Sequence, residues 1–327
     1  MKLYFKRTSK ETRYVMSEKV KEIDYAINRG FEEIRNAQDI ISNYTNHDHV
    51  RIVNSGNSAI LATMSSFKGK IMLPDQGGWS GFKNAADFLD LDTVELSTEL
   101  GVINIDTLNE FIDVYKPEAL FITSFAGYIA EQPIKKIYEI CEDKNVCLVV
   151  DASGGVGDKE KKLSNGDYAH IIVASTGSPK IVNVGSGGFI STNNNTIFKK
   201  NKFILKSLKA NPIVCTGIVE EIKNAPDFLF KNIKACQSFK KMFKSAVYKD
   251  KRGISVALKV DDPKKTGILL RQHLKIDQRN IITVCPRYDR LLIDAVCLEI
   301  KNLDFRCMEN DTIKEIVRII KDVTEIN

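Results

Sequence analysis

Two runs of the chain decide the fold: CLVVDASGGVGD at residues 147–158 and, after a short polar connection, DYAHIIVASTGSPKIVNVGSGG at residues 167–188. Within them, the apolar segments 146–150 and 170–174 are rich in β-branched residues. Continuous apolar runs of this length are typical of strands that are buried on both faces of a parallel sheet. We therefore predict two adjacent parallel strands here.

Three side chains of complementary chemistry follow these predicted strands. Asp151 stands at the end of the first, and Ser175 and Lys180 follow the second, just before a glycine cluster at 185–188. Because parallel strands end at one edge of a sheet, the three groups are expected to meet there. They suit pyridoxal 5'-phosphate (PLP): the amine can form a Schiff base with its aldehyde, the carboxylate can keep its pyridine nitrogen protonated, and the hydroxyl can bind its phosphate.

The preceding hundred residues alternate between predicted strands and helices. The expected strands are 50–53, 71–73, 93–96 and 119–123, and the expected helices are 59–67, 79–89, 106–115 (capped by Asp106) and 134–144. Such alternation predicts a parallel sheet with helices packed on it. The fold class is therefore α/β, a three-layer, mostly parallel sheet.

The two ends of the chain have different patterns. Residues 16–44 predict one helix or two, interrupted near Gly30, and residues 195–250 predict successive lysine-rich helices with Pro212 and Pro226 as breakers. A small C-terminal α+β domain is expected from strands at 254–260, 281–285 and 291–300 and helices at 264–273 and 312–323. The expected divisions are 1–45 (helical segment), 46–205 (PLP-binding domain) and 206–327 (linking helices and small domain).

Composition sets further limits. The 327 residues carry a net charge of +6, and the seven cysteines form no CxxC pair, so we expect reduced core thiols and no metal site. The absence of an apolar run of roughly 18 residues or of a signal-like N-terminus predicts a cytoplasmic protein without a membrane partner.

The lysine-rich band at 199–251 is expected to be a solvated surface. A nucleic-acid partner stays open, although no aromatic stacking motif is interleaved with the lysines to support it.

Four motifs in chain order carry a family resemblance. They are VNSGNSAILA (53–62), IMLPDQGGWSGFKNAADFL (71–89), SFAGYIAEQPIKKIYEICEDKNVCLVVDAS (124–153) and STGSPKIVNVGSGG (175–188). Each lies at the carboxyl end of a predicted strand or runs into one. Together they resemble the fold-type-I PLP enzymes, and among them the aminotransferase family that includes the nucleotide-sugar aminotransferases.

The resemblance implies roles for residues around the cofactor ring. Lys180 would carry the cofactor as a Schiff base and then act as general base and acid for the proton shift. Burial beside the ring is expected to lower the pKa of its amine. Asp151 would bond to the pyridine nitrogen, and Ser153 would contact the ring edge.

It also implies a phosphate site and a stacking partner. Gly56, Asn57 and Ser58 would bind the phosphate through backbone N–H groups and the Ser58 hydroxyl, with Ser175 adding a second hydroxyl. Trp79, the only tryptophan, would stack on the pyridine face. This sequence has one residue more than the family between Pro74 and Trp79. The extra residue affects the alignment of Trp79 with the aromatic residue that stacks on the ring in the family.

The substrate side is less defined by the sequence. Tyr128 could shape the substrate entrance, and Arg287 and Arg290 are candidates for binding a substrate carboxylate. The expected activity is that of a homodimeric aminotransferase acting on a small amino substrate. Two alternatives stay open. The first is a lyase or an enzyme that transfers sulfur or selenium, including one that carries out β-replacement on an aminoacyl-tRNA. The second is a non-catalytic binding subunit of the same fold.

Overall fold

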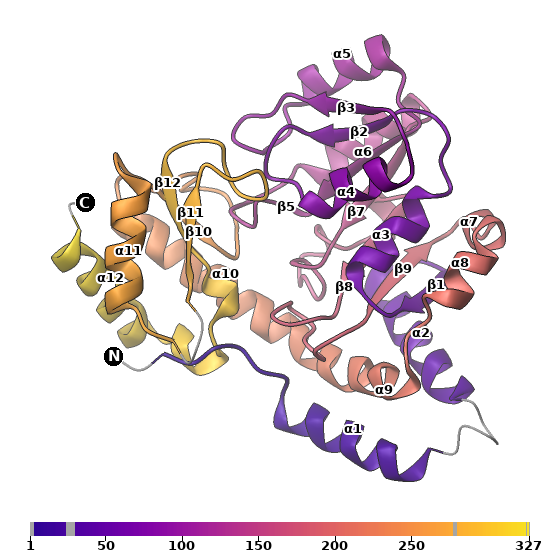
Figure 1. Cartoon of the computed structure of the whole chain (residues 1–327), viewed down its shortest axis with the longest axis horizontal. Coiled ribbons are helices and arrows are strands. Elements are labelled where there is room, and N and C mark those ends of the chain that lie inside the picture. The colour runs from indigo at the N-terminus through magenta and orange to yellow at the C-terminus, as the bar shows by residue number, and fades with distance from the viewer. Residues whose placement is uncertain (1–2, 24–29, 277–279, 325, 327) are drawn as a thin grey trace.

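A seven-stranded mixed sheet forms the centre of the larger domain. The computed structural model describes residues 3–23, 30–276, 280–324 and 326. The strands are β1 (His49–Val53), β2 (Ile71–Pro74), β3 (Thr93–Leu96), β4 (Ala119–Thr123), β7 (Cys147–Asp151), β8 (Ile171–Ser175) and β9 (Gly188–Thr192). Their order across the sheet is β1-β9-β8-β7-β4-β2-β3 (Figure 1). The run from β8 to β3 is parallel, as the sequence predicts.

Helices cover both faces of this sheet. The four that follow its early strands are α3 (Gly56–Met64), α4 (Ser80–Phe88), α5 (Ile105–Tyr115) and α6 (Ile134–Asp143). Successive side chains of a strand point to opposite faces. Accordingly Leu120 and Leu148 join the core beneath α5 and α6, while Phe121 and Val149 join the core beneath α3 and α4. The predicted three-layer α/β architecture is confirmed.

Strand β9 is not foreseen by the sequence analysis. It runs antiparallel to both neighbours, with Ser175 opposite Gly188 in β8 and Val53 opposite Gly188 in β1. Its glycine-rich start is typical of a loop, and it ends with polar residues that are nevertheless fully buried. Ser191 Oγ bonds to His47 Nδ1 at 2.9 Å and Thr192 Oγ1 donates to the carbonyl of His170, so their burial leaves these hydroxyls partnered.

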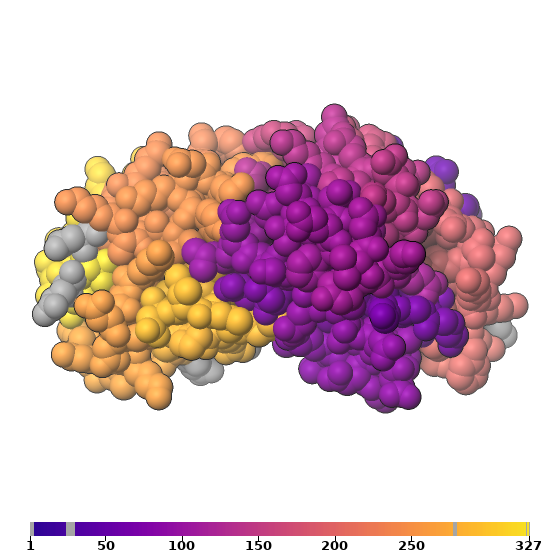
Figure 2. Space-filling model, turned by 90° about the horizontal axis from the view of Figure 1, so that it is seen from above, coloured from indigo at the N-terminus to yellow at the C-terminus, as the bar shows by residue number. Residues whose placement is uncertain are grey.

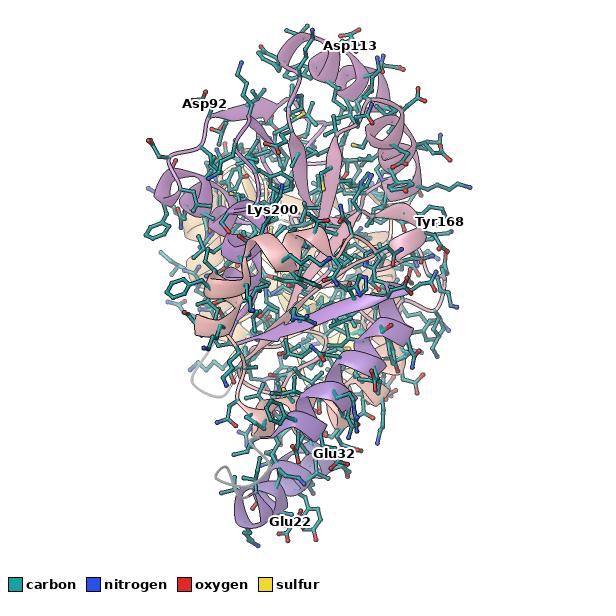
Figure 3. The ribbon with its side chains drawn as sticks, turned by 90° about the vertical axis from the view of Figure 1, so that its right-hand side faces the viewer. Glu22, Glu32, Asp92, Asp113, Tyr168 and Lys200 are labelled. Carbon is teal, nitrogen blue, oxygen red and sulfur yellow. The ribbon has the colours of Figure 1, made fainter. Side chains whose placement is uncertain are left out.

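Of the two N-terminal helices, one packs on the sheet and the other on helix α9 (Pro212–Glu221). Helix α1 (Lys10–Glu22) starts earlier than expected because Ser9 caps it, accepting from the N–H of Thr12. Helix α2 (Phe31–Thr45) begins after Gly30, where φ is +68°, and lies beside β1 (Figure 3). The expected interruption near Gly30 therefore exists, although residues 24–29 lie outside the described residues.

Caps also correct another helix boundary. Asn104, and not Asp106, is the N-cap of α5: its Oδ1 accepts from the N–H groups of Asp106 and Thr107. Asp106 instead lies in the first turn, where a carboxylate is stabilised by the helix dipole.

The remainder of the chain forms linking helices and a small α+β domain. Its helices are α7 (Thr196–Lys200), α8 (Lys202–Ser207), α9 (Pro212–Glu221), α10 (Ala225–Met242), α11 (Pro263–His273) and α12 (Asn310–Val323). Strands β10 (Val256–Lys259), β11 (Ile282–Cys285) and β12 (Ala295–Leu298) form an antiparallel sheet in the order β10-β12-β11. Pro212 and Pro226 begin helices, at positions where the missing N–H costs nothing. Viewed from above, this domain lies beside the larger one (Figure 2).

A fully buried lysine connects the two domains. Lys240 of α10 is 0 % exposed, and its ammonium donates to the carbonyls of Ile129 (2.8 Å), Tyr248 (3.0 Å) and Lys251 (2.8 Å). Burial lowers its pKa to about 8. The three carbonyls supply the partners that a buried charge requires.

Among the described residues, no helix combines the length and the apolar composition needed to cross a bilayer, and no cluster of histidine, cysteine and carboxylate side chains could hold a metal ion.

Candidate active site

The carboxyl ends of β7 and β8 bring three predicted site residues together. Asp151 is the last residue of β7 and Ser175 the last of β8. Asp151 Oδ1 accepts from the N–H of Ser153 (2.9 Å), and Ser153 Oγ accepts from the N–H of Ser175 (2.8 Å). Ser153 therefore links the two strand ends and fixes the direction of the Asp151 carboxylate.

Lys180 projects between two aromatic side chains. Its Nζ donates to the hydroxyl of Tyr128 at 2.7 Å and lies 5.3 Å from the centroid of the Trp79 ring. Tyr128 comes from the turn between the short strands β5 (Phe125–Ala126) and β6 (Ala130–Glu131), whereas Trp79 precedes α4. The extra residue before Trp79 therefore still leaves its ring beside Lys180.

The charges of Lys180 and Asp151 act on one another. Burial lowers the pKa of Lys180, but Tyr128 and Asp151 outweigh this effect, so the pKa is raised. The expected lowering is thus wrong for the amine in these surroundings, because its two neighbours favour the charged form. Burial raises the pKa of Asp151, opposed first by the charge of Lys180. Each group therefore lies within the electrostatic influence of the other.

The start of α3 lies against the end of β8. A Cβ atom at Gly56 would lie 2.5 Å from Cβ of Ser175, so only glycine allows this approach. Residues 56–59, the first turn, carry only uncharged side chains. Since the N-terminus of a helix attracts anions through its N–H groups and its dipole, this turn can bind a phosphate.

The side chains of this turn are partly engaged within the chain. Asn57 Oδ1 accepts from Trp79 Nε1 at 2.9 Å, which holds the indole in place. Ser58 Oγ donates to Asn54 Oδ1 at 2.5 Å and also bonds to Ser55 Oγ. The N–H of Ser58 donates to Ser55 Oγ at 3.1 Å. The N–H groups of Gly56 and Asn57, with Ser175, are therefore better placed to bind a phosphate than Ser58.

A buried ionic cluster lies behind Tyr128, on the side of the small domain. The guanidinium carbon of Arg290 and the Nζ of Lys301 lie 4.8 and 4.7 Å from the centroid of the Tyr128 ring. Glu299 accepts from Arg290 Nε at 2.7 Å and pairs with Lys301 Nζ at 3.2 Å. Burial lowers the pKa of Lys301 to about 8, while Arg290 and Lys301 hold that of Glu299 below its usual range although burial opposes this.

The two predicted carboxylate-binding arginines differ in position. Arg290 is buried against Tyr128, whereas the side chain of Arg287 is 60 % exposed and its Nε bonds to Asp289 at 2.6 Å. Arg290 is therefore the better placed candidate. Glu299 and Lys301 are not among the site residues that the sequence predicts. Their signal is a carboxylate and an amine inside the apolar run CLEIKNL at 297–303.

The residues present fit PLP. The cofactor has an aldehyde, a pyridine nitrogen and a phosphate, and the site offers an amine, a buried carboxylate and the N-terminus of a helix. The close approach of Gly56 to Ser175 places the start of α3 beside the end of β8, where the Ser175 hydroxyl lies.

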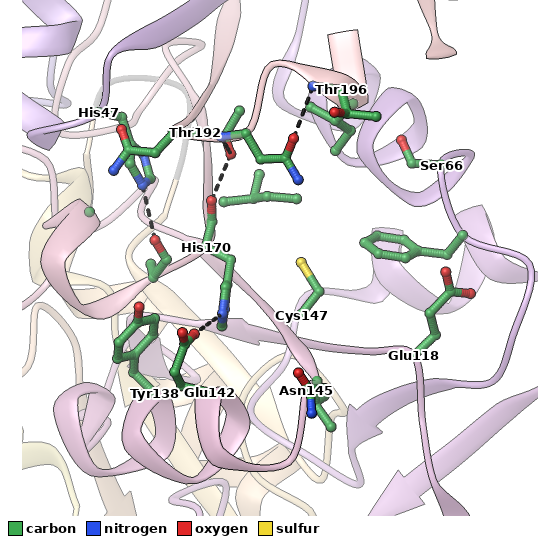
Figure 4. Close-up of a pocket in the computed structure, with 18 of the residues that line it drawn as sticks. His47, Ser66, Glu118, Tyr138, Glu142, Asn145, Cys147, His170, Thr192 and Thr196 are labelled. Carbon is green, nitrogen blue, oxygen red and sulfur yellow. Dashed lines mark hydrogen bonds and ion pairs between the residues drawn. The ribbon is translucent and has the colours of Figure 1, made fainter. Parts of the chain in front are cut away.

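A cavity lies at the opposite edge of the sheet (Figure 4). It has a volume of about 560 Å³ and contains His170, Glu142 and Cys147. His170 Nδ1 accepts from the N–H of Leu148, so its proton is on Nε2, which bonds to Glu142 at 2.7 Å. Burial raises the pKa of Cys147 to about 12, so its thiol is not a nucleophile at neutral pH.

This fold, with these groups at the carboxyl edge of its sheet, defines the class of fold-type-I PLP-dependent enzymes. The chain belongs to the DegT/DnrJ/EryC1/StrS aminotransferase family, whose model matches residues 12–210. Residues 226–321 match the MJ1341 family C-terminal domain. The protein is thus an enzyme of an aminotransferase family, and its cofactor is PLP.

Solved structures share the whole fold. Serine palmitoyltransferase from Sphingomonas wittichii is similar with a TM-score of 0.78 and 11% identity, covering 99% of this chain and 86% of that one. PseC from Helicobacter pylori, an aminotransferase involved in the biosynthesis of pseudoaminic acid, has a TM-score of 0.78 and 13% identity, covering 99% and 98%. No curated protein sequence matches the chain.

Proposed function

We propose that the protein is a PLP-dependent aminotransferase that acts on a small amino substrate and carries its cofactor on Lys180 as a Schiff base. One observation carries this proposal: at the edge of the sheet, the Lys180 amine bonds to Tyr128 at 2.7 Å and feels the charge of the buried Asp151 carboxylate. Membership of an aminotransferase family supports the reaction class.

Each side chain then has a defined task. When bound, PLP supplies an electron sink for the charge left on the substrate carbon that loses its proton. Lys180 would take that proton and return it to the carbon that comes from the cofactor's aldehyde, on the other side of the substrate nitrogen, while Tyr128 holds the amine in position. Asp151 holds a proton on the pyridine nitrogen, and its burial makes that charge-assisted bond strong. Trp79 covers one face of the ring and excludes water from it.

We further propose that Arg290 takes part in binding a substrate carboxylate, that the protein is a cytoplasmic homodimer, and that its working parts are residues 1–45, 46–205 and 206–327. The position of Arg290 against Tyr128 supports the first of these. The two family matches, which end at 210 and begin at 226, support a division near the predicted one.

Reduction with borohydride tests the covalent linkage. Protein incubated with PLP and then reduced should carry the label on the peptide that contains Lys180, and Lys180→Ala should carry none. Lys136→Ala, a change of an exposed lysine in α6, is the matched control and should be labelled like the wild type. A Lys180→Ala protein with the same label yield would overturn the assignment.

The product identifies the reaction. An amino donor alone should convert the cofactor to pyridoxamine phosphate and release a keto acid in equal amount. Release of ammonia, sulfide or selenide with the cofactor left as PLP would instead identify a lyase or a sulfur- or selenium-transfer enzyme. Tight, steeply salt-dependent binding of transfer RNA would favour an aminoacyl-tRNA substrate.

A further inference from the structure

A lysine near the N-terminus contacts the backbone of Lys180. The Nζ of Lys6 donates to the carbonyl of Lys180 at 2.6 Å and to that of Ile181 at 2.7 Å. Lys6 is 5 % exposed, and its Nζ lies 3.4 Å from the centroid of the Phe228 ring. Both carbonyls belong to the peptide groups that follow the Cα atoms of residues 180 and 181, so Lys6 fixes the backbone from which the Lys180 side chain leaves.

The segment that carries Lys6 belongs structurally to the small domain. The N–H of Lys6 donates to the carbonyl of Asn302 at 2.8 Å, and the N–H of Asp304 donates to the carbonyl of Tyr4 at 2.9 Å. The chain then crosses to the larger domain, where α1 lies under α9 (Figure 1). Lys6 therefore extends from a strand-like pairing with the small domain to the loop of Lys180.

The same stretch of the small domain reaches Lys180 by a second route. Lys301 precedes the residue that pairs with Lys6, and its ammonium lies 4.7 Å from the centroid of the Tyr128 ring. Tyr128 in turn bonds to the Lys180 amine. The backbone of Lys180 and its side chain are thus both held by contacts that start within residues 301–304.

From this geometry we propose that Lys6 is a positioning residue for Lys180. It couples the placement of the small domain to the orientation of the amine that carries the cofactor. This inference rests on the proposed function, since it requires Lys180 to be the reactive lysine. It adds a residue from outside the sheet edge.

The charge of Lys6 responds to pH in the neutral range. Burial and the charge of Lys301 lower its pKa, Glu221 of α9 and Asp304 oppose this, and the result is about 7. Below pH 7 the ammonium makes charge-assisted bonds to the two carbonyls, whereas above pH 7 the neutral amine makes weaker ones. Arginine at this position keeps its charge across the whole range.

The rate at which PLP links to the apoprotein tests the proposal without any turnover. Samples are quenched with borohydride at intervals, at pH 6 and pH 8.5, and urea unfolding of each apoprotein is measured in parallel. Lys6→Met should slow linkage about tenfold at pH 6, because two bonds from a charged donor are lost. Lys10→Met, which changes an exposed lysine of α1, should match the wild type. Lys6→Arg should restore most of the rate.

The pH dependence separates positioning from a purely structural role. The ratio of the wild-type rate to the Lys6→Arg rate should fall from pH 6 to pH 8.5, because only the wild type loses its charge. A folded Lys6→Met protein that links within twofold of the wild type at both pH values would overturn the proposal. If Lys6→Met does not fold, an unchanging ratio of wild type to Lys6→Arg would overturn it. A wild type that forms no linkage at Lys180 would overturn the proposed function and this inference together.

Discussion

Tyr128 has a backbone conformation that side chains rarely adopt. Its φ is +65°, and its carbonyl accepts from the N–H groups of Ile254 and Ser255, both at 2.9 Å. Left-handed backbone costs a bulky residue energy and persists where the surroundings enforce it, often at functional sites. Here the small domain enforces it, and the result directs the phenol toward Lys180.

Removing the Tyr128 hydroxyl should change the titration of Lys180. Tyr128 raises the pKa of Lys180, so Tyr128→Phe should lower it. Because only the neutral amine attacks the aldehyde, the pH profile of PLP linkage should shift to lower pH. Tyr115→Phe, on the 40 % exposed Tyr115, is the control. An unshifted profile for Tyr128→Phe would show that the hydroxyl does not hold the amine.

Gly56 allows the close contact between α3 and β8. In Gly56→Ala the new Cβ would lie 2.5 Å from Cβ of Ser175, so the helix start must move away. We expect PLP affinity to fall tenfold or more and the apoprotein to lose about 1–3 kcal/mol of stability. Gly69→Ala, where the new Cβ meets the carboxylate of Glu118, a flexible side chain, at 3.1 Å, is the control. PLP affinity is measured by fluorescence titration. Equal affinity in Gly56→Ala and the wild type would show that this turn does not bind the cofactor.

At the scale of elements, the ionic cluster behind Tyr128 anchors the end of β12. Glu299 accepts from Arg290 and from the hydroxyl of Ser255, and it pairs with Lys301. Glu299→Gln leaves two buried cations without their carboxylate. It should cost about 3 kcal/mol or more in the free energy of unfolding at pH 7, measured with urea.

The sign of the pH dependence follows from the lowered pKa of Glu299. A carboxylate whose folded pKa is depressed stabilises the protein above its unfolded pKa of about 4.3 and loses this contribution as pH falls toward the folded pKa. The difference in stability between the wild type and Glu299→Gln should therefore narrow below about pH 4. Glu315→Gln, on the surface of α12, should change stability little at either pH. A difference that is constant from pH 7 to pH 3 would contradict the assignment of the charge to Glu299.

At the scale of the whole molecule, large apolar side chains lie exposed on the N-terminal helices and on the lysine-rich helices. We expect dimer contacts in these two regions. Phe31 on α2 is 68 % exposed and Phe203 on α8 is 81 % exposed. Sedimentation equilibrium should show a dimer for the wild type and a monomer for Phe31→Glu combined with Phe203→Glu, because burying either new carboxylate is costly. Val114→Glu, at a 72 % exposed position of α5, should stay dimeric. A monomeric wild type would contradict the homodimer.

The sequence predicts what local patterns encode. The parallel strands follow from apolar runs, and the proximity of Asp151 to Ser175 follows from strands that end at one edge. Strand β9 was missed because buried Ser191 and Thr192 find partners far away in the chain, at His47 and His170. The observed start of a helix differs from the predicted one where the capping residue is another than the one expected, as with Asn104 in place of Asp106 at α5.

The surroundings of Lys180 lie beyond local patterns for the same reason. Lys6 and Lys301 read as ordinary charged residues until folding brings them beside a loop more than a hundred positions away. Their only local sign is a charged residue within an apolar run. Pairing across such distances is decided by tertiary packing, which a single sequence shows only indirectly.

The carbonyl cage around Lys240 has a practical consequence. An amine enclosed on three sides by backbone oxygens is shielded from acylating reagents, while the many lysines on the outer helices react at once. Acetylation followed by mass spectrometry would therefore leave residue 240 unmodified as long as the two domains stay docked. The rate at which acetylated Lys240 appears would therefore measure how often the two domains separate.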